Sequence, residues 1–437
     1  MTEMRVAIAG LGTVGTGLLR ILGDEGADRA PKPLTVTAVS ARNRSRDRGV
    51  DLSEFAWFDD PVAMAGSDQA DVFVELIGGE DGVAKAAVEA ALKSGKHVVT
   101  ANKALMCRHG LALAQLAEDH GVALRYEAAV AGGVPIVRGL RDGLAQAQVL
   151  GLMGVLNGTC NFILSQMNET GASFEDALLE AQRLGFAEAD PTFDIGGIDA
   201  AHKLVVLTAL AFDAMPTLEE VDLLGIDAVT VDDISAADEM GLTIKLVAEA
   251  ARHGTGLSLR VGPALLPIES QVAQTLGSDN IVIAEASPVG RVAFSGPGAG
   301  GGATATAVAA DLVTIARGAT GPVFSVPAAK IDAQPTVTAA DTHDPYFLRL
   351  RVADEPGVLA QVTNALAEAN VSVDTIHQAP AHLPTDDSSG EPVDIVITTH
   401  LVPRPSVRPL LTTLEALPIV HGRPSMFPIL TELDPSS

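Results

Sequence analysis

The first 22 residues constrain the fold more than any other stretch of the chain. An apolar run at residues 4–9 leads directly into Gly-Leu-Gly-Thr-Val-Gly at residues 10–15, and a helix-forming run follows. Glycines at this spacing let the backbone turn tightly, so that a pyrophosphate can bind at the helix N-terminus. A second predicted strand, residues 34–40, completes the start of a strand-helix-strand unit. The predicted cofactor contacts in this turn are Gly10, Leu11, Gly12, Thr13, Val14 and Gly15.

Further strands and helices alternate after this unit. Apolar runs at residues 72–77 and 96–100 flank a helical run at residues 82–94. This order predicts an α/β fold with a Rossmann-type, doubly wound parallel sheet. Ligands bind beyond the carboxyl ends of such strands, which places Gly78, Thr100 and Lys103 over a nicotinamide. A second glycine-rich sequence at residues 296–301 leads into a single helix and is interpreted as a wall near the cofactor.

The loop after the second strand is rich in arginine. Residues 40–48 contain four arginines where a cofactor without a 2′-phosphate usually meets an acidic residue. Guanidinium groups pair with phosphate, so Arg42 and Arg44 indicate NADP, although NAD stays possible. The alternative is a solvated basic loop without a binding role.

Acidic residues and one lysine are concentrated around residues 186–203. The run at residues 199–212 is apolar on nearly every face and is predicted to be a buried helix. Asp199 and Lys203 are four residues apart and therefore lie on the same face near its N-terminus. Glu188 and Asp194 lie just upstream and add more negative charge than one lysine balances. The surplus carboxylates could hold a cationic amine and the lysine could donate a proton; the alternative is an ordinary salt bridge.

Composition excludes several classes of partner. The chain of 437 residues carries 29 Lys and Arg against 55 Asp and Glu, a net charge of −26, which argues against nucleic acid and anionic membranes. No apolar run is long enough for a transmembrane helix, and no signal peptide is recognised, so a cytoplasmic protein is expected. Two cysteines, Cys107 and Cys160, give no disulfide framework. A catalytic role for Cys160 would indicate a phosphorylating semialdehyde dehydrogenase, whereas a small buried residue is the alternative.

The middle of the chain predicts a second, α+β domain. Strands are expected at residues 149–156 and 258–266, and helices at residues 162–168, 173–184 and 199–212. Residues 157–161 are interpreted as a polar turn that could face the substrate, with Gly158 and Thr159 as contacts.

The last part of the chain predicts a small separate module. Residues 322–340 are rich in Pro, Ala and Thr and are interpreted as a linker. Strands and helices then follow in the order βαββαβ, with the last strand near Ile419. The turn at residues 354–357 precedes a helix, whose free amides could bind the carboxylate of an amino acid. Asp354 and Gly357 are the regulatory candidates, and a dimerisation module without a ligand is the alternative.

Taken together, these motifs resemble homoserine dehydrogenase with a C-terminal ACT domain. The resemblance covers residues 5 to about 320 and rests on six sequences: GLGTVG, VVTANKAL, YEAAVAGGVPI, LNGTCNFIL, the block from GFAEADP to GGIDAAHKL, and GPGAGGGATA. The tail resembles an ACT domain through DEPGVLAQV. A dinucleotide- and amino-acid-binding sensor without catalytic activity is the alternative from another functional class.

The resemblance implies an activity and a set of residue roles. It implies reversible reduction of L-aspartate 4-semialdehyde to L-homoserine with NAD(P)H, in threonine, methionine and isoleucine biosynthesis. Lys203 is then the proton donor, Lys103 lies beside the nicotinamide and substrate, and Glu188 and Asp199, supported by Asp194, hold the substrate. A sodium ion is implied at the turn that contains Glu127, Val130, Gly132 and Val134. Gly185 and Gly302 complete the candidate cofactor contacts.

The expected organisation follows the same resemblance. Residues 1–136 and about 303–325 would form the NAD(P)-binding domain, and residues 137–302 the substrate-binding and dimerisation domain. Residues 326–343 would be a linker and residues 344–430 a ferredoxin-like ACT domain. A homodimer or homotetramer, possible control by L-threonine, and no nucleic-acid or membrane partner are expected.

Overall fold

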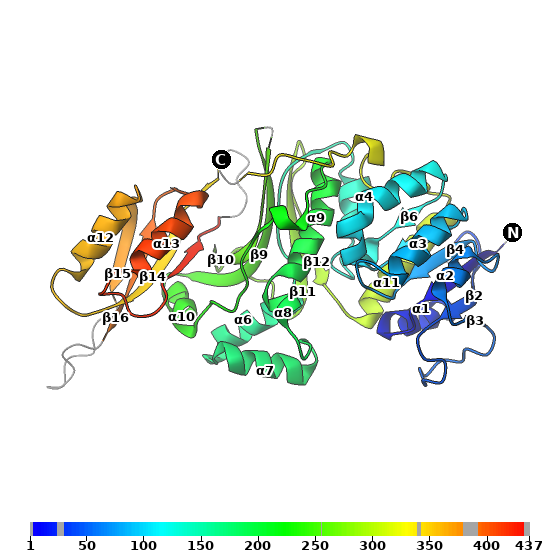
Figure 1. Ribbon diagram of the computed structural model, residues 1–437, viewed down its shortest axis with the longest axis horizontal. Coiled ribbons are helices and arrows are strands. Elements are labelled where there is room, and N and C mark those ends of the chain that lie inside the picture. Colours follow the sequence, from blue (N-terminus) through cyan, green and yellow to red (C-terminus); the bar gives the residue numbers. More distant parts are fainter. Residues whose placement is uncertain (1–2, 24–29, 255, 339–341, 379–391, 432–437) are drawn as a thin grey trace. The chain divides into compact units, whose positions relative to one another are not determined.

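A computed structural model describes residues 3–23, 30–254, 256–338, 342–378 and 392–431 (Figure 1). The chain forms two compact units, each assembled from segments that are separated in the sequence. Unit 1 comprises residues 1–158, 199–221 and 278–335, and unit 2 comprises residues 159–198, 222–277 and 336–437.

Unit 1 contains a six-stranded parallel sheet with the strand order β3-β2-β1-β4-β5-β6. Its strands are β1 (Met4–Ala9), β2 (Leu34–Ser40), β3 (Ala56–Phe58), β4 (Val72–Glu75), β5 (His97–Thr100) and β6 (Leu124–Arg125). The central strands β1 and β4 are almost entirely apolar because both of their faces are buried. The strand order reverses between β1 and β4, which is where such sheets bind ligands. The predicted Rossmann-type sheet is confirmed.

Helices pack around this sheet. They are α1 (Thr13–Gly23), α2 (Pro61–Gly66), α3 (Val83–Lys93), α4 (Lys103–Asp119), the short α5 (Ile136–Arg138) and α11 (Gly301–Ala316). Helices α1 and α11 approach so closely that a Cβ atom on Gly17 would lie 3.2 Å from the carbonyl oxygen of Gly301. The second glycine-rich sequence therefore starts a helix that lies directly beside the first one.

Unit 1 also contains three further strands and a buried helix. Strand β11 (Asp279–Ser287) pairs antiparallel with β7 (Gln148–Val155) and with β12 (Gly290–Pro297). The sequence analysis did not predict β11 or β12. Helix α9 (Ile198–Phe212) is buried along nearly its whole length, as predicted from its apolar sequence.

Unit 2 contains the helices α6 (Gly158–Thr170), α7 (Phe174–Leu184), α8 (Thr192–Ile195) and α10 (Val231–Glu239). Strand β10 (Gly256–Pro267) pairs antiparallel with β9 (Leu242–His253) and parallel with the short β8 (Asp222–Leu223). The prediction of a polar turn at residues 157–161 is wrong, because α6 already begins at Gly158. Among the described residues, no helix is both long and apolar enough to cross a bilayer.

The tail of the chain forms the predicted βαββαβ module within unit 2. Its elements are β14 (Tyr346–Val352), α12 (Val358–Glu368), β15 (Val373–Gln378), β16 (Val393–Thr399), α13 (Val407–Glu415) and β18 (Ser425–Pro428). The strand order is β15-β16-β14-β18, and the short β13 (His343–Asp344) and β17 (Val402–Pro403) pair separately. The last strand was predicted near Ile419, and this position is wrong. Ile419 packs against the module's core instead, and the strand follows Pro424.

Candidate active site

The glycine-rich turn after β1 has the geometry of a dinucleotide site. Gly10 has φ +104°, and a Cβ atom there would lie 2.3 Å from the carbonyl oxygen of Leu76. A Cβ atom on Gly15 would lie 2.1 Å from the carbonyl oxygen of Gly10. A Cβ atom on Gly12, by contrast, would meet nothing within 4 Å. The outer glycines thus permit the close packing of strand and helix, and the middle glycine leaves backbone open to a ligand at the start of α1.

A buried carboxylate organises the adjoining strand ends. Glu75, at the end of β4, is fully buried and accepts hydrogen bonds from the backbone amides of Ile77 (2.7 Å) and Gly78 (2.9 Å). Its other oxygen accepts a 2.5 Å hydrogen bond from the hydroxyl of Thr100. Thr100 is itself fully buried, and its hydroxyl supports the turn through this bond. The sequence analysis overlooked Glu75, although a charged residue ending a buried strand was a visible signal.

Two lysines meet one carboxylate in unit 1. One oxygen of Asp199 lies 3.0 Å from Lys103 Nζ, and the other accepts a 2.8 Å hydrogen bond from Lys203 Nζ. Asn157 donates a further hydrogen bond of 2.9 Å to Asp199, and Lys203 also donates one of 2.6 Å to the carbonyl oxygen of Leu156. Burial alone would raise the pKa of Asp199, but the two ammonium groups outweigh it and hold that pKa below its ordinary value. The site thus contains an ionised carboxylate and one surplus positive charge.

The secondary structure fixes these three side chains. Lys103 is the first residue of α4, whose N-cap Asn102 accepts a 3.0 Å hydrogen bond from the amide of Leu105 and donates one of 2.7 Å to the carbonyl of Gly79. Asp199 and Lys203 lie one turn apart on α9, with the carboxylate in the first turn, where the helix dipole favours it. The contact between Lys103 and Asp199 could not be predicted, because the two residues lie far apart in the sequence.

The other predicted substrate contacts, Thr159, Glu188 and Asp194, belong to unit 2, whereas Gly158, which starts α6, is assigned to unit 1. In unit 2, Thr159 donates a 2.8 Å hydrogen bond to the carbonyl of Phe186 and lies 3.4 Å from the carboxylate of Asp194. Glu188 is exposed, and its backbone carbonyl accepts a hydrogen bond from the side chain of Gln182. Cys160 is fully buried, with its sulfur 3.1 Å from the carbonyl of Asp194. Burial of this kind is typical of a structural cysteine rather than a nucleophile.

Gly185, a predicted cofactor contact, has a structural explanation in unit 2. It has φ +79° and ends α7 in the left-handed conformation, which glycine adopts without strain. Gly302 lies in the first turn of α11, where a Cβ atom would meet nothing within 4 Å.

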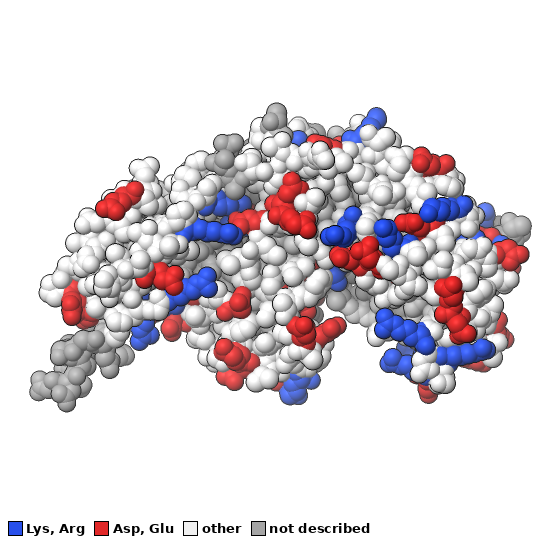
Figure 2. Space-filling model, in the orientation of Figure 1, with Lys and Arg blue, Asp and Glu red and all other residues white. Residues whose placement is uncertain are grey.

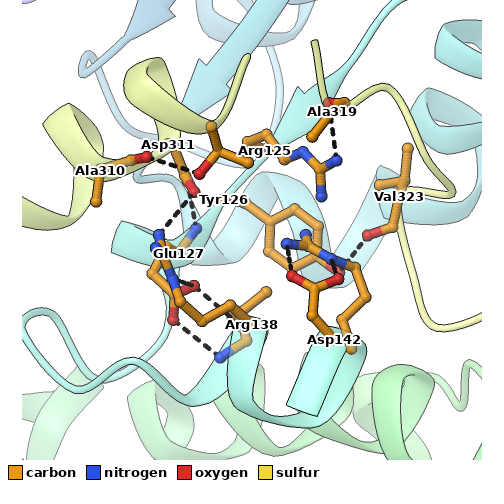
Figure 3. Close-up of polar contacts among 12 residues, drawn as sticks. Arg125, Tyr126, Glu127, Arg138, Asp142, Ala310, Asp311, Ala319 and Val323 are labelled. Atoms are coloured by element: carbon orange, nitrogen blue, oxygen red, sulfur yellow. Dashed lines mark hydrogen bonds and ion pairs between the residues drawn. The ribbon is translucent and has the colours of Figure 1, made fainter. Parts of the chain in front are cut away.

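The predicted cation-binding turn adjoins a buried charge cluster (Figure 3). Both carboxylate oxygens of Glu127 accept hydrogen bonds, from the amide of Val137 (2.9 Å) and from the amide and guanidinium of Arg138 (3.0 and 2.9 Å). Asp311 accepts from the amide of Glu127 at 2.9 Å; its burial, and the nearby charge of Glu127, raise its pKa to about 7. With its carboxylate so engaged, Glu127 could offer a cation its backbone carbonyl. Among the described residues, no cluster of three or more His, Cys, Asp or Glu side chains could hold a metal ion.

The remainder of that turn is made of backbone. Gly132 has φ +48°, and a Cβ atom there would lie 2.6 Å from the carbonyl oxygen of Gly298. Val130 and Val134 are fully buried, and the carbonyl oxygen of Val134 accepts a 2.8 Å hydrogen bond from the amide of Ile136. Backbone carbonyl oxygens are suitable ligands for hard cations.

Arg42 and Arg44 lie in the exposed loop after β2, at the carboxyl end of the parallel sheet. Figure 2 shows basic side chains gathered at the lower right, where Figure 1 draws the loop that leads to β3. In the tail module, Gly357 has φ +93° and caps the N-terminus of α12, and Asp354 is exposed in the same turn.

Comparison with known proteins agrees with this geometry. The family model for the NAD-binding domain of homoserine dehydrogenase matches residues 10–127, and the homoserine dehydrogenase model matches residues 135–313. An ACT domain model matches residues 346–419. The homoserine dehydrogenase of Pseudomonas aeruginosa is 40% identical over 433 residues, covering 97% of this chain and 98% of that protein. The chain belongs to the homoserine dehydrogenase family.

Further relatives support the assignment to this family of NAD(P)-dependent oxidoreductases. The homoserine dehydrogenase of Neisseria gonorrhoeae is 38% identical over 430 residues, covering 96% of this chain and 97% of that protein. A crystal structure of a homoserine dehydrogenase from Thiobacillus denitrificans superposes with a TM-score of 0.90 at 38% identity and covers 99% of both chains. A hyperthermophilic archaeal homoserine dehydrogenase in complex with NADPH has a TM-score of 0.63 at 25% identity and covers 72% of this chain and 97% of that one.

Proposed function

We propose that this homoserine dehydrogenase reversibly reduces L-aspartate 4-semialdehyde to L-homoserine with NADPH, and that Lys203 donates the proton. Hydride transfer to the aldehyde carbon leaves negative charge on the oxygen, which must take up a proton to form the alcohol. The supporting observation is the carboxylate of Asp199 between the ammonium groups of Lys103 and Lys203, 3.0 and 2.8 Å away. The surplus positive charge stabilises the developing alkoxide, and an ammonium group can supply the proton.

Substrate binding is proposed for the residues that match the family's acidic block. Glu188, Asp194 and Asp199 would bind the substrate amine, because an ammonium group needs carboxylate partners when it leaves water. Thr159 and Gly158, at the start of α6, would contact the rest of the substrate. The boundaries proposed above for the NAD(P)-binding, substrate-binding and ACT domains belong to the same proposal.

NADP is the proposed physiological cofactor. The arginine-rich loop after β2 lies where a Rossmann fold meets the adenosine ribose, and guanidinium groups suit a 2′-phosphate. We further propose that a sodium ion binds backbone carbonyl oxygens of Glu127, Val130, Gly132 and Val134. The proposed assembly is a cytoplasmic homodimer or homotetramer that serves threonine, methionine and isoleucine biosynthesis.

The full-length protein tests the activity directly. With L-homoserine, we expect NADP to be reduced without inorganic phosphate, and kcat/KM to be higher with NADP than with NAD. The Cys160→Ser variant should keep most of its turnover, because the thiol is buried and no step uses it. Absorbance of the reduced nicotinamide measures each rate. Dependence on phosphate together with an inactive Cys160→Ser variant would support the semialdehyde dehydrogenase instead, and no reduction at all would support the non-catalytic sensor.

L-threonine is proposed to bind the turn at Asp354 and Gly357 and to lower activity through different affinities for two states of the assembly. Gly357→Val should abolish the threonine response while homoserine turnover persists, because a β-branched residue is strained at φ +93°. Glu355→Ala, in the same exposed turn, is the matched control. Initial rates against threonine concentration measure the response. An unchanged response in Gly357→Val would contradict this site.

A point substitution is a cleaner test than removal of the module. Arg349 of β14 is buried, and its Nε donates a 2.6 Å hydrogen bond to the fully buried Asp233 of α10. Ser425 of β18 also donates to Asp233, at 3.1 Å. Deleting the module would break these contacts, and a loss of activity could then reflect damage to the fold.

A further inference from the structure

Trp57 lies beneath the arginine-rich loop. It is the central residue of β3, which pairs with the end of β2 in the register Val39 opposite Trp57. The indole ring is half-buried, and its Nε1 donates a 2.8 Å hydrogen bond to Asp59. The guanidinium carbons of Arg44 and Arg48 lie over this ring, 5.6 and 5.9 Å from its centroid. Both distances fall within the range of a cation–π interaction.

The two arginines have different further contacts. Arg48 donates hydrogen bonds to three backbone carbonyls, those of Leu11 (3.2 Å), Asn43 (2.6 Å) and Arg46 (2.8 Å). Leu11 belongs to the glycine-rich turn, so Arg48 ties the arginine-rich loop to the predicted pyrophosphate site. Because its guanidinium N–H groups donate to these carbonyls, Arg48 holds the loop in place. Arg44 is exposed and rests on the same ring, which leaves the N–H edge of its planar guanidinium able to meet a phosphate.

We propose that Trp57 is a positioning residue for cofactor specificity, which holds Arg44 toward the 2′-phosphate of NADP with Arg48 as the fixed support. This inference rests on the proposed preference for NADP. An exposed arginine side chain samples many rotamers, and ordering it on binding weakens affinity. Stacking on Trp57 orders the guanidinium in advance, so the 2′-phosphate meets an oriented pair of donors. NAD lacks that phosphate and should gain little from this arrangement.

The test compares Trp57→Leu with Trp57→Phe in the full-length enzyme. Leucine removes the aromatic face, and phenylalanine keeps one. We expect Trp57→Leu to raise KM for NADP by about 3–10-fold, the equivalent of one or two exposed cation–π contacts. KM for NAD and kcat with either cofactor should stay near the wild-type values, and Trp57→Phe should restore most of the NADP affinity. A merely structural role would weaken both cofactors alike.

A double-mutant cycle identifies the partner through which Trp57 acts. If Trp57 works by orienting Arg44, then Trp57→Leu should have little further effect on KM for NADP in an Arg44→Ala background. Arg42→Ala is the control background, in which Trp57→Leu should keep its full effect. Additive losses of NADP affinity in Trp57→Leu/Arg44→Ala would overturn the inference.

The same measurements separate this inference from the proposal beneath it. A wild-type enzyme that prefers NAD would refute the proposed cofactor, and the role of Trp57 would fall with it. A wild-type preference for NADP that Trp57→Leu leaves unchanged would refute the role of Trp57 alone. If Trp57→Leu folds poorly, its activity should fall equally with NADP and with NAD. The ratio of KM for NADP to KM for NAD in Trp57→Phe and in Arg44→Ala would then decide.

Discussion

Replacing Lys203 with methionine is expected to lower the turnover of L-homoserine by about 10²–10⁴-fold, the usual contribution of a positioned proton-transfer group. Methionine fills a similar volume but carries no proton, so the change removes the chemistry and keeps most of the packing around a side chain that is nearly buried in the wild type. In the oxidation of L-homoserine, the group that donates the proton during reduction must instead accept the hydroxyl proton as hydride leaves the carbon, and methionine can do neither. Steady-state rates with saturating NADP and homoserine measure the loss.

Two comparisons make this result specific. Lys85→Met removes a lysine from α3, away from the carboxylate of Asp199, and should leave turnover near that of the wild type. Lys103→Met removes the other ammonium group at Asp199. The side chain of Lys103 is more exposed than that of Lys203. If Lys103→Met abolishes turnover and Lys203→Met does not, the proton donor is Lys103 and the proposed roles are reversed.

Local sequence signals predicted much of this site. The strand, the three glycines and the following helix fix the dinucleotide turn, because each outer glycine is required by a close backbone approach. The apolar run of α9 and the four-residue spacing of Asp199 and Lys203 predict their shared face. These features depend on neighbours within a few residues, which is the range over which periodicity and turn chemistry act.

Features that depend on tertiary contacts were missed. Lys103 at the start of α4 reaches Asp199 in the first turn of α9, and no local pattern encodes that contact. In the sequence, Glu75 resembles an ordinary polar residue at the end of a strand. Its role depends on the hydrogen bonds that its carboxylate accepts from Thr100 and from two backbone amides. Strands β11 and β12 did carry a local signal, two apolar runs around a Pro-Val-Gly turn, which was overlooked. The helical start of α6 was misjudged because its first residues, Gly158 and Thr159, resemble a turn.

The charge balance at Asp199 can be tested through stability. In Asp199→Asn, the amide keeps the shape of the side chain, but Lys103 and Lys203 lose the carboxylate that lies between them. Removing one partner of a buried ion pair costs about 3–5 kcal/mol, so the midpoint of thermal unfolding at pH 7 should fall by on the order of 10 °C. Glu180→Gln, which removes the partner of Arg183 in an ion pair whose two side chains are both exposed, is the control and should change the midpoint little.

The pH dependence of that loss identifies its cause. The pKa of Asp199 is held below its ordinary value in the folded protein, so its carboxylate stabilises the fold fully at pH values above about 4, the unfolded pKa. Below that pH the unfolded chain takes up a proton before the folded one does, and the stabilisation declines. The difference in unfolding midpoint between wild type and Asp199→Asn should therefore be constant from pH 6 to 8 and shrink as the pH falls below about 4. A difference that persists unchanged into acid would mean that the substitution acts through packing, and that the carboxylate is not the counterion of the two lysines.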